Sequence, residues 1–213
     1  MHGEPKLIPE PVYLPSNEPY LGRETVYWFD KIIVSCLDVN AKIAAYTHRG
    51  NLSDLQRAAC QLIPQGINLA LTIRELIRQG YLFGALVLLR PLIERIAIVS
   101  YLHANPSEIS IWESGWKKRE RPHLIQMIQT MSGGKADIEV IKDIYDYTSH
   151  LVHGDPMSAD WNLVHLGKGG LGYSVGKVID APELCDFISM QALCYLIVIM
   201  EMMKKYFPEA IIA

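Results

Sequence analysis

The chain has 213 residues, half of them hydrophobic and a fifth charged, a composition typical of a globular protein and too apolar for intrinsic disorder. The formal net charge of −3 provides no broad basic surface, so composition argues against general binding of nucleic acid. The four cysteines are far apart and form no Cys-x-x-Cys pair. This argues against a zinc ribbon or a secreted disulfide framework and favours a cytoplasmic protein with reduced thiols.

The first half of the chain predicts an arm followed by two long helices. Residues 1–20 contain five prolines, which predict an extended arm, because proline lacks a backbone donor. No apolar signal-like segment occurs there. A helical pattern covers residues 21–48. A second helix is expected to start at the possible N-caps Asn51 and Ser53, to kink at Pro64 and to end at Gly80.

The second half continues the helical pattern with one interruption. Residues 81–104 are apolar nearly all round, which is typical of a central helix, and shorter helices are expected over 122–131 and 136–153. Residues 160–180 contain two β-like runs around a glycine-rich turn, which predict a hairpin. A last helix is expected from about 182 to 206. We therefore expect an all-α bundle of five or six helices with one small hairpin, in a single domain over 21–213.

We expect no membrane-spanning segment from these patterns. The third helix carries three charged residues at its centre, which are costly in lipid. The apolar run 187–200 is by itself too short to cross a bilayer.

Two charged residues stand in the apolar third helix. In LLRPLIER, Arg90 and Glu94 are four residues apart and so share one helical face. Burying an unpaired charge is costly, so both groups need partners. They form either an internal pair that fixes packing or the lining of a pocket, in which Arg90 binds a carboxylate or phosphate and Glu94 acts as a base. Pro91 leaves the Val87 carbonyl without its helical donor and predicts a bend near Arg90.

The stretch YDYTSHLVHGDP holds the second polar group. Asp146, His150 and His153 follow i, i+4, i+7 spacing and line one helical face. Histidines in a last turn also complement the helix dipole while solvated. A metal site made by these three residues with Glu94 is a sharper alternative, and a nucleophilic Ser149 beside a histidine is a weaker one.

These same residues carry a resemblance. LLRPLIERIAIVSYL followed by YDYTSHLVHGDP resembles a family of all-helical bacterial proteins, over about residues 55–207. Its signatures are an Arg-Pro-Leu-x-Glu-type helix and a Ser-x-x-x-His-Gly helix end. The resemblance implies that Arg90, Glu94, Ser149 and His153 meet; the family brings no established activity. A looser likeness is to HEPN domains, helical dimers that often act as ribonucleases, but this chain lacks their Arg-x4-6-His motif.

The sequence therefore favours a non-catalytic or accessory module that binds a small molecule or a protein partner at Arg90, Glu94, Ser149 and His153, without a cofactor. The alternative is a hydrolase, either a degenerate HEPN-like ribonuclease or a metal-dependent enzyme. Its catalytic candidates are Glu94, His150 and His153. A homodimer is expected, with the apolar last helix and the aromatic stretch 110–123 as candidate interfaces.

Overall fold

A computed structural model describes residues 18–48, 50–117, 120–131, 138–159, 161, 163–165, 169–173 and 181–212. Helix α1 spans Glu24–Thr47 and α2 spans Asp54–Gln79. The start of α2 is fixed by a capping box in which the Ser53 hydroxyl accepts from the Gln56 amide and the Gln56 side chain accepts from the Ser53 amide. Gly80 ends α2 with a φ of 79°, a conformation that glycine adopts without steric cost. The helix continues through Pro64 as one element.

The expected third helix is divided. Helix α3 spans Leu82–Val87 and α4 spans Leu89–Ala104, with a turn at Leu88 between them. Pro91 lies in the first turn of α4, where a missing backbone donor costs least. The prediction of one continuous helix is therefore wrong at this point, and the interruption falls where Pro91 predicted a disturbance.

Shorter elements follow α4. They are the 3-10 helix η1 Pro106–Glu108, α5 Ile109–Glu113, α6 Leu124–Thr130, α7 Ile138–Val152 and α8 Pro156–Ala159. Strands β1 Leu163–His165 and β2 Leu171–Tyr173 pair antiparallel, with Val164 opposite Gly172. The chain then forms α9 Pro182–Tyr206 and α10 Pro208–Ile212.

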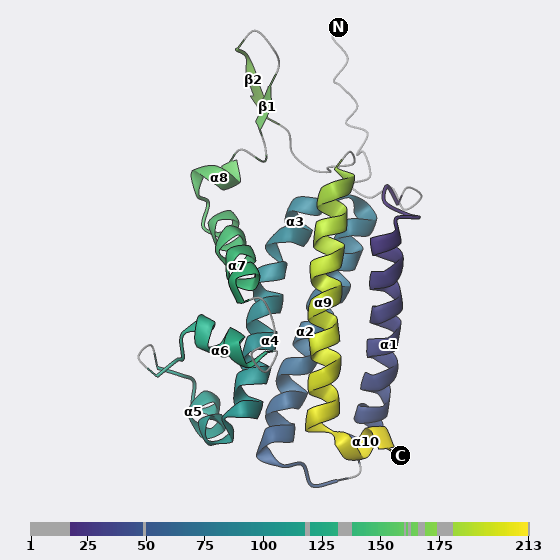
Figure 1. The fold of residues 1–213 in the computed structure, drawn as a ribbon, viewed down its shortest axis with the longest axis vertical. Helices are drawn as coiled ribbons and strands as arrows, with labels where there is room; N and C mark the ends of the chain where they lie inside the picture. The colour runs from purple at the N-terminus through teal and green to yellow at the C-terminus, as the bar shows by residue number, and fades with distance from the viewer. Residues whose placement is uncertain are drawn as a thin grey trace, which may run out of the picture.

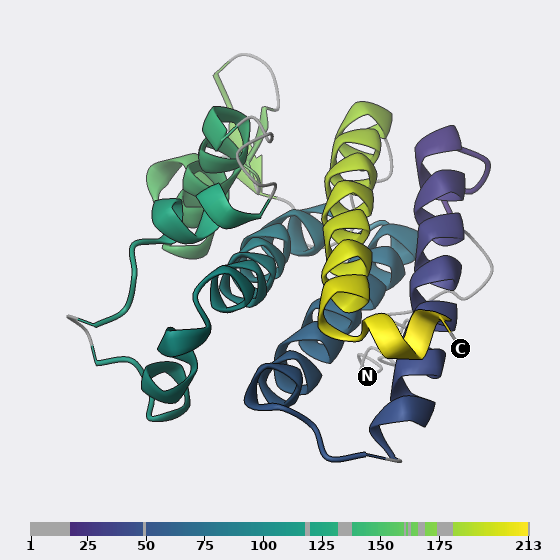
Figure 2. The same ribbon diagram turned by 60° about the horizontal axis from the view of Figure 1, so that its bottom comes forward.

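Helices α1, α2, α4 and α9 form the body of the molecule, and Figure 1 shows α9 in front of α2 and between α1 and α4. Figure 2 shows α6 and α7 on the opposite side of α4 from α1, α2 and α9. Helices α2 and α9 approach closely at Gly66, where an added Cβ would lie 2.7 Å from the Ile199 Cδ1 atom. The buried apolar side chains form one cluster, which includes eight of the sixteen residues of α4.

The expected number of helices needs correction. The described residues form more helices than the five or six expected, because the third helix divides and the short helices α5, α8 and α10 have too few residues for a periodic pattern. The run 187–200 belongs to the 25-residue helix α9, which is long and apolar enough to cross a membrane by length and composition, a test that core helices of soluble proteins also pass. Residues 1–17 of the expected arm, and residues 160, 162, 166–168 and 174–180 of the expected hairpin, lie outside the described residues.

Candidate functional site

Helix α4 brings Arg90 and Glu94 together near its N-terminal end. Their side chains are 19% and 20% exposed, and Arg90 Nε donates to Glu94 Oε1 over 3.4 Å. This distance is long for a charge-assisted hydrogen bond. The pair is therefore a loose contact that leaves the guanidinium able to bind other groups.

Helix α7 supplies the next partner of both charged groups. It packs against α4 through Ile144, Thr148 and Leu151, its buried residues. The same packing places the Tyr145 hydroxyl beside the pair, where it accepts from Arg90 Nη2 over 3.2 Å and donates to Glu94 Oε1 over 3.1 Å. The hydroxyl group thus bridges the cation and the carboxylate, using its donor and an acceptor lone pair at once.

The end of α7 supplies the last member of this group, His153. Arg90 Nη1 lies 3.1 Å from His153 Nε2. A guanidinium can only donate, so His153 Nε2 can take part in this contact only as the acceptor. Arg90 therefore contacts Glu94, Tyr145 and His153; we name these four residues the Arg90 cluster.

The Arg90 cluster borders an open pocket of about 360 Å³, a volume within the range of small-molecule sites. Apolar side chains from α3, α4 and α7 share its lining with three polar members of the cluster. The lining residues are Val87, Arg90, Pro91, Glu94, Val152 and His153.

Among the described residues, the side chains of the other residues expected at the site make no hydrogen bond to the cluster. His150 is 51% exposed, and its Nδ1 lies 2.7 Å from Asp155 Oδ2. Asp146 is exposed, and Ser149 contributes its carbonyl to the His153 amide. In the part of the chain that the structure describes, no group of three or more His, Cys, Asp or Glu side chains is placed to hold a metal ion. The two histidines thus point to different partners, and only His153 meets Arg90.

Sequence reasoning missed Tyr145 as a member of the cluster. A signal was present, because Tyr145, Ser149 and His153 are spaced by four residues and so follow one face of a helix. Burial raises the pKa of the Tyr145 hydroxyl, and the negative charge of Glu94 raises it further. The hydroxyl group is therefore protonated at neutral pH, as its donor role to Glu94 requires.

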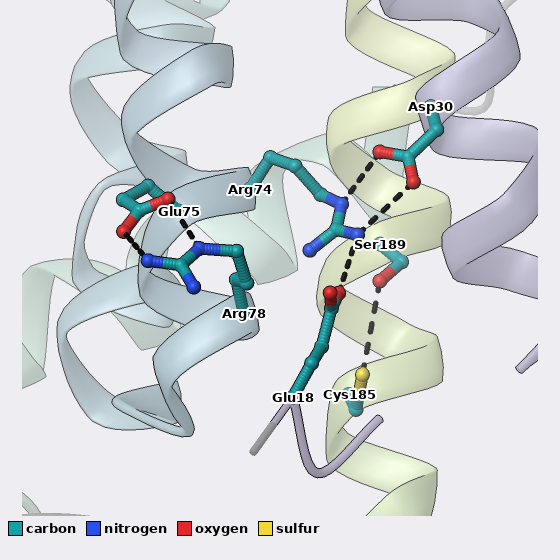
Figure 3. Close-up of polar contacts among 7 residues, drawn as sticks. All are labelled: Glu18, Asp30, Arg74, Glu75, Arg78, Cys185 and Ser189. Carbon is teal, nitrogen blue, oxygen red and sulfur yellow. Dashed lines mark hydrogen bonds and ion pairs between the residues drawn. The ribbon is translucent and has the colours of Figure 1, made fainter. Parts of the chain in front are cut away.

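A second group of polar side chains lies at the end of the bundle where α1 begins and α2 ends, at the top in Figure 1. Figure 3 shows Arg74 of α2 between Asp30 of α1 and Glu18, which precedes α1. Arg74 is only 14% exposed and lies 2.5 Å from an oxygen of each carboxylate. Burial alone would lower the pKa of Arg74, but the contacts of its guanidinium with the carboxylates of Asp30 and Glu18 outweigh burial and raise that pKa. With two carboxylates already on one guanidinium, we interpret this group as a structural link between α1 and α2.

A neighbouring pair links α1 to α9. Arg23 Nε donates to Asp186 Oδ1 over 2.7 Å, and the Thr25 hydroxyl donates to the same oxygen over 2.5 Å. The hydrogen bond from Arg23 lowers the pKa of Asp186. These contacts hold the N-terminal ends of α1 and α9 together. Figure 1 shows that both helices begin at the same end of the bundle and run in the same direction.

We compared the chain with protein-family models, curated proteins and solved structures, and none of the three comparisons gave a match. A functional proposal for this chain therefore rests on its own residues.

Proposed function

We propose that the chain is a binding module that holds an anionic group of a small molecule or of a protein partner at Arg90. The observation that carries this proposal is the open pocket beside a partly buried arginine whose guanidinium contacts three neighbouring side chains. Carboxylate and phosphate groups are the partners that the planar guanidinium suits best.

The Arg90 guanidinium is preorganised but not saturated. Of its five N–H groups, three are directed at Glu94, Tyr145 and His153 among the described residues. One N–H on each Nη atom remains for a ligand. Because the side chain is already ordered, binding loses little of its rotamer entropy.

The surroundings of Arg90 indicate what kind of ligand fits. Glu94 offsets the charge of Arg90, so the pocket offers no excess positive charge for a polyanion. Val87, Pro91 and Val152 offer apolar surface beside the guanidinium. A ligand with one anionic group and a compact apolar body matches this lining.

The test uses phenyl phosphate and benzoate as probes, with the uncharged benzamide as a control of the same shape. Thermal unfolding is followed with each probe for the wild type, for Arg90→Gln and for the matched variant Arg95→Gln. Arg95 also lies on α4 but donates to Gln65 outside the pocket. We expect the two anions, but not benzamide, to raise the Tm of the wild type and of Arg95→Gln and to leave Arg90→Gln unchanged. An equal response to benzamide, or an undiminished response of Arg90→Gln, would contradict the proposal.

A hydrolase is the second candidate, because Glu94 and His153 line the same pocket. In that case Glu94→Gln and His153→Ala abolish turnover of a single-stranded RNA or of a p-nitrophenyl ester while the fold stays nearly as stable. The binding-module proposal instead expects no turnover of these substrates by the wild type.

A further inference from the structure

The outer face of α9 carries a regular stripe of exposed residues. Seven exposed residues of α9 follow one another at intervals of four and three residues, and Lys205 is the one further exposed residue of this helix. They are Glu183, Phe187, Met190, Cys194, Ile197, Glu201 and Lys204; we name them the α9 stripe. Its middle is apolar, with Phe187, Met190 and Ile197 between 38% and 42% exposed, and its ends are charged.

The opposite face of α9 is buried against α1, α2 and α4. In Figure 1, α9 lies nearest the viewer, and no other described element stands in front of the middle of the helix. Only 39% of the most apolar 18-residue window of α9 is buried. The apolar part of the α9 stripe thus remains open to a partner.

The width of the α9 stripe indicates what kind of partner would pack against it. Intervals of four and three residues are the heptad spacing of a helix–helix seam, which is narrower than the apolar face of a helix buried in a globular core. A helix that lies on a membrane presents a broad apolar face flanked by many lysines and arginines, which the α9 stripe lacks. The spacing of the α9 stripe therefore fits a single helix with an apolar seam of its own.

We propose that the partner is α9 of a second copy of this chain, packed antiparallel about a two-fold axis between Leu193 and Cys194. This register places Met190 opposite Ile197 and the acidic Glu183 beside the basic Lys204 of the partner subunit. A parallel register would instead place Glu183 beside Glu183 and Lys204 beside Lys204, and like charges across a helix seam are destabilising. A closed two-fold dimer needs such a self-complementary surface.

The proposal is independent of the ligand at Arg90, because none of the residues that line the pocket belongs to α9. The dimer and the pocket can therefore fail separately in experiment. Dimer formation would cover the apolar part of the α9 stripe.

The first experiment measures the mass of the full chain in solution between 1 and 50 μM under reducing conditions. We expect twice the monomer mass of 24.1 kDa for the wild type. Met190→Glu and Ile197→Glu should raise the Kd for dimerisation at least a hundredfold. The matched control is Ile125→Glu, since Ile125 on α6 is as exposed, at 43%, and lies outside the stripe. A wild-type monomer at 50 μM, or variants that dimerise like the wild type, would overturn the proposal.

The second experiment tests orientation with a short bismaleimide cross-linker, in chains that carry Cys60→Ser and Cys194→Ser. Glu183 and Lys204 are separated by 21 residues of α9, or about 32 Å. An antiparallel dimer therefore cross-links only when Glu183→Cys and Lys204→Cys chains are mixed. Cross-linking of either variant with itself would overturn this register. Wild-type protein that floats with phosphatidylcholine vesicles, while Met190→Glu does not, would assign the stripe to a lipid surface instead.

Discussion

The Tyr145 hydroxyl offers the sharpest test of how the Arg90 cluster is held together. It accepts from Arg90 over 3.2 Å and donates to Glu94 over 3.1 Å. Tyr145→Phe removes both hydrogen bonds and keeps the ring, including its packing beneath the Arg90 guanidinium at 5.0 Å. The substitution thus isolates the hydroxyl group.

The distances and exposure of the Tyr145 contacts set the expected loss of stability in Tyr145→Phe. A hydrogen bond to a buried charged group contributes about 1.5–3 kcal/mol, but Arg90 and Glu94 are 19% and 20% exposed, so water replaces part of each bond. Both distances also lie at the long end of the usual range. We therefore expect a loss of about 2 kcal/mol in the free energy of unfolding, or about 4–8 °C in Tm for a chain of this length.

The matched control is Tyr147→Phe. Tyr147 is also half-buried on α7, and its hydroxyl makes no hydrogen bond to another described residue, so its loss should change the free energy of unfolding by less than about 0.5 kcal/mol. Urea unfolding at pH 7, followed by circular dichroism, measures both variants. Equal losses for Tyr145→Phe and Tyr147→Phe would refute the assignment of the Tyr145 hydroxyl as a bridge.

Three further predictions concern the rest of the bundle. Arg74→Met should lower the free energy of unfolding by about 2 kcal/mol, because it leaves two partly buried carboxylates without their cation. Its control is Arg78→Met, on the exposed side of α2, which should leave the midpoint of urea unfolding unchanged. Arg23 lowers the pKa of Asp186 in the folded chain, so this carboxylate adds stability above its unfolded pKa and loses it as pH falls below about 4. Asp186→Asn should therefore flatten the fall in stability between pH 4.5 and 2, measured by urea titration. Burial raises the pKa of Cys36 to about 12, so a thiol reagent at pH 8 should modify Cys36 only after unfolding, as peptide mapping would show.

The sequence predicted those helices whose ends carry local signals. Ser53 and Gly80 fix the ends of α2, and Pro182 begins α9 at the expected residue. The division of the third helix at Leu88 was not predicted, although Pro91 pointed to a disturbance nearby. Local patterns define where a helix starts and stops, but a break inside an apolar run also depends on how its halves pack.

The site was predictable only in part for a related reason. Arg90 and Glu94 were recognised because charges are costly in an apolar helix. Which residues of α7 meet them depends on the rotation of α7 against α4, which one sequence does not specify. That rotation turns Tyr145 and His153 toward Arg90 and leaves His150 with Asp155.

A crystal structure of the protein with phenyl phosphate would show whether Arg90 holds an anionic group in the pocket between α4 and α7. We expect phosphate oxygens at hydrogen-bond distance, about 2.7–3.2 Å, from both Arg90 Nη atoms, with the phenyl ring against Val87, Pro91 or Val152. A pocket that stays empty at a ligand concentration that saturates the thermal shift, or a phosphate bound elsewhere, would contradict this expectation.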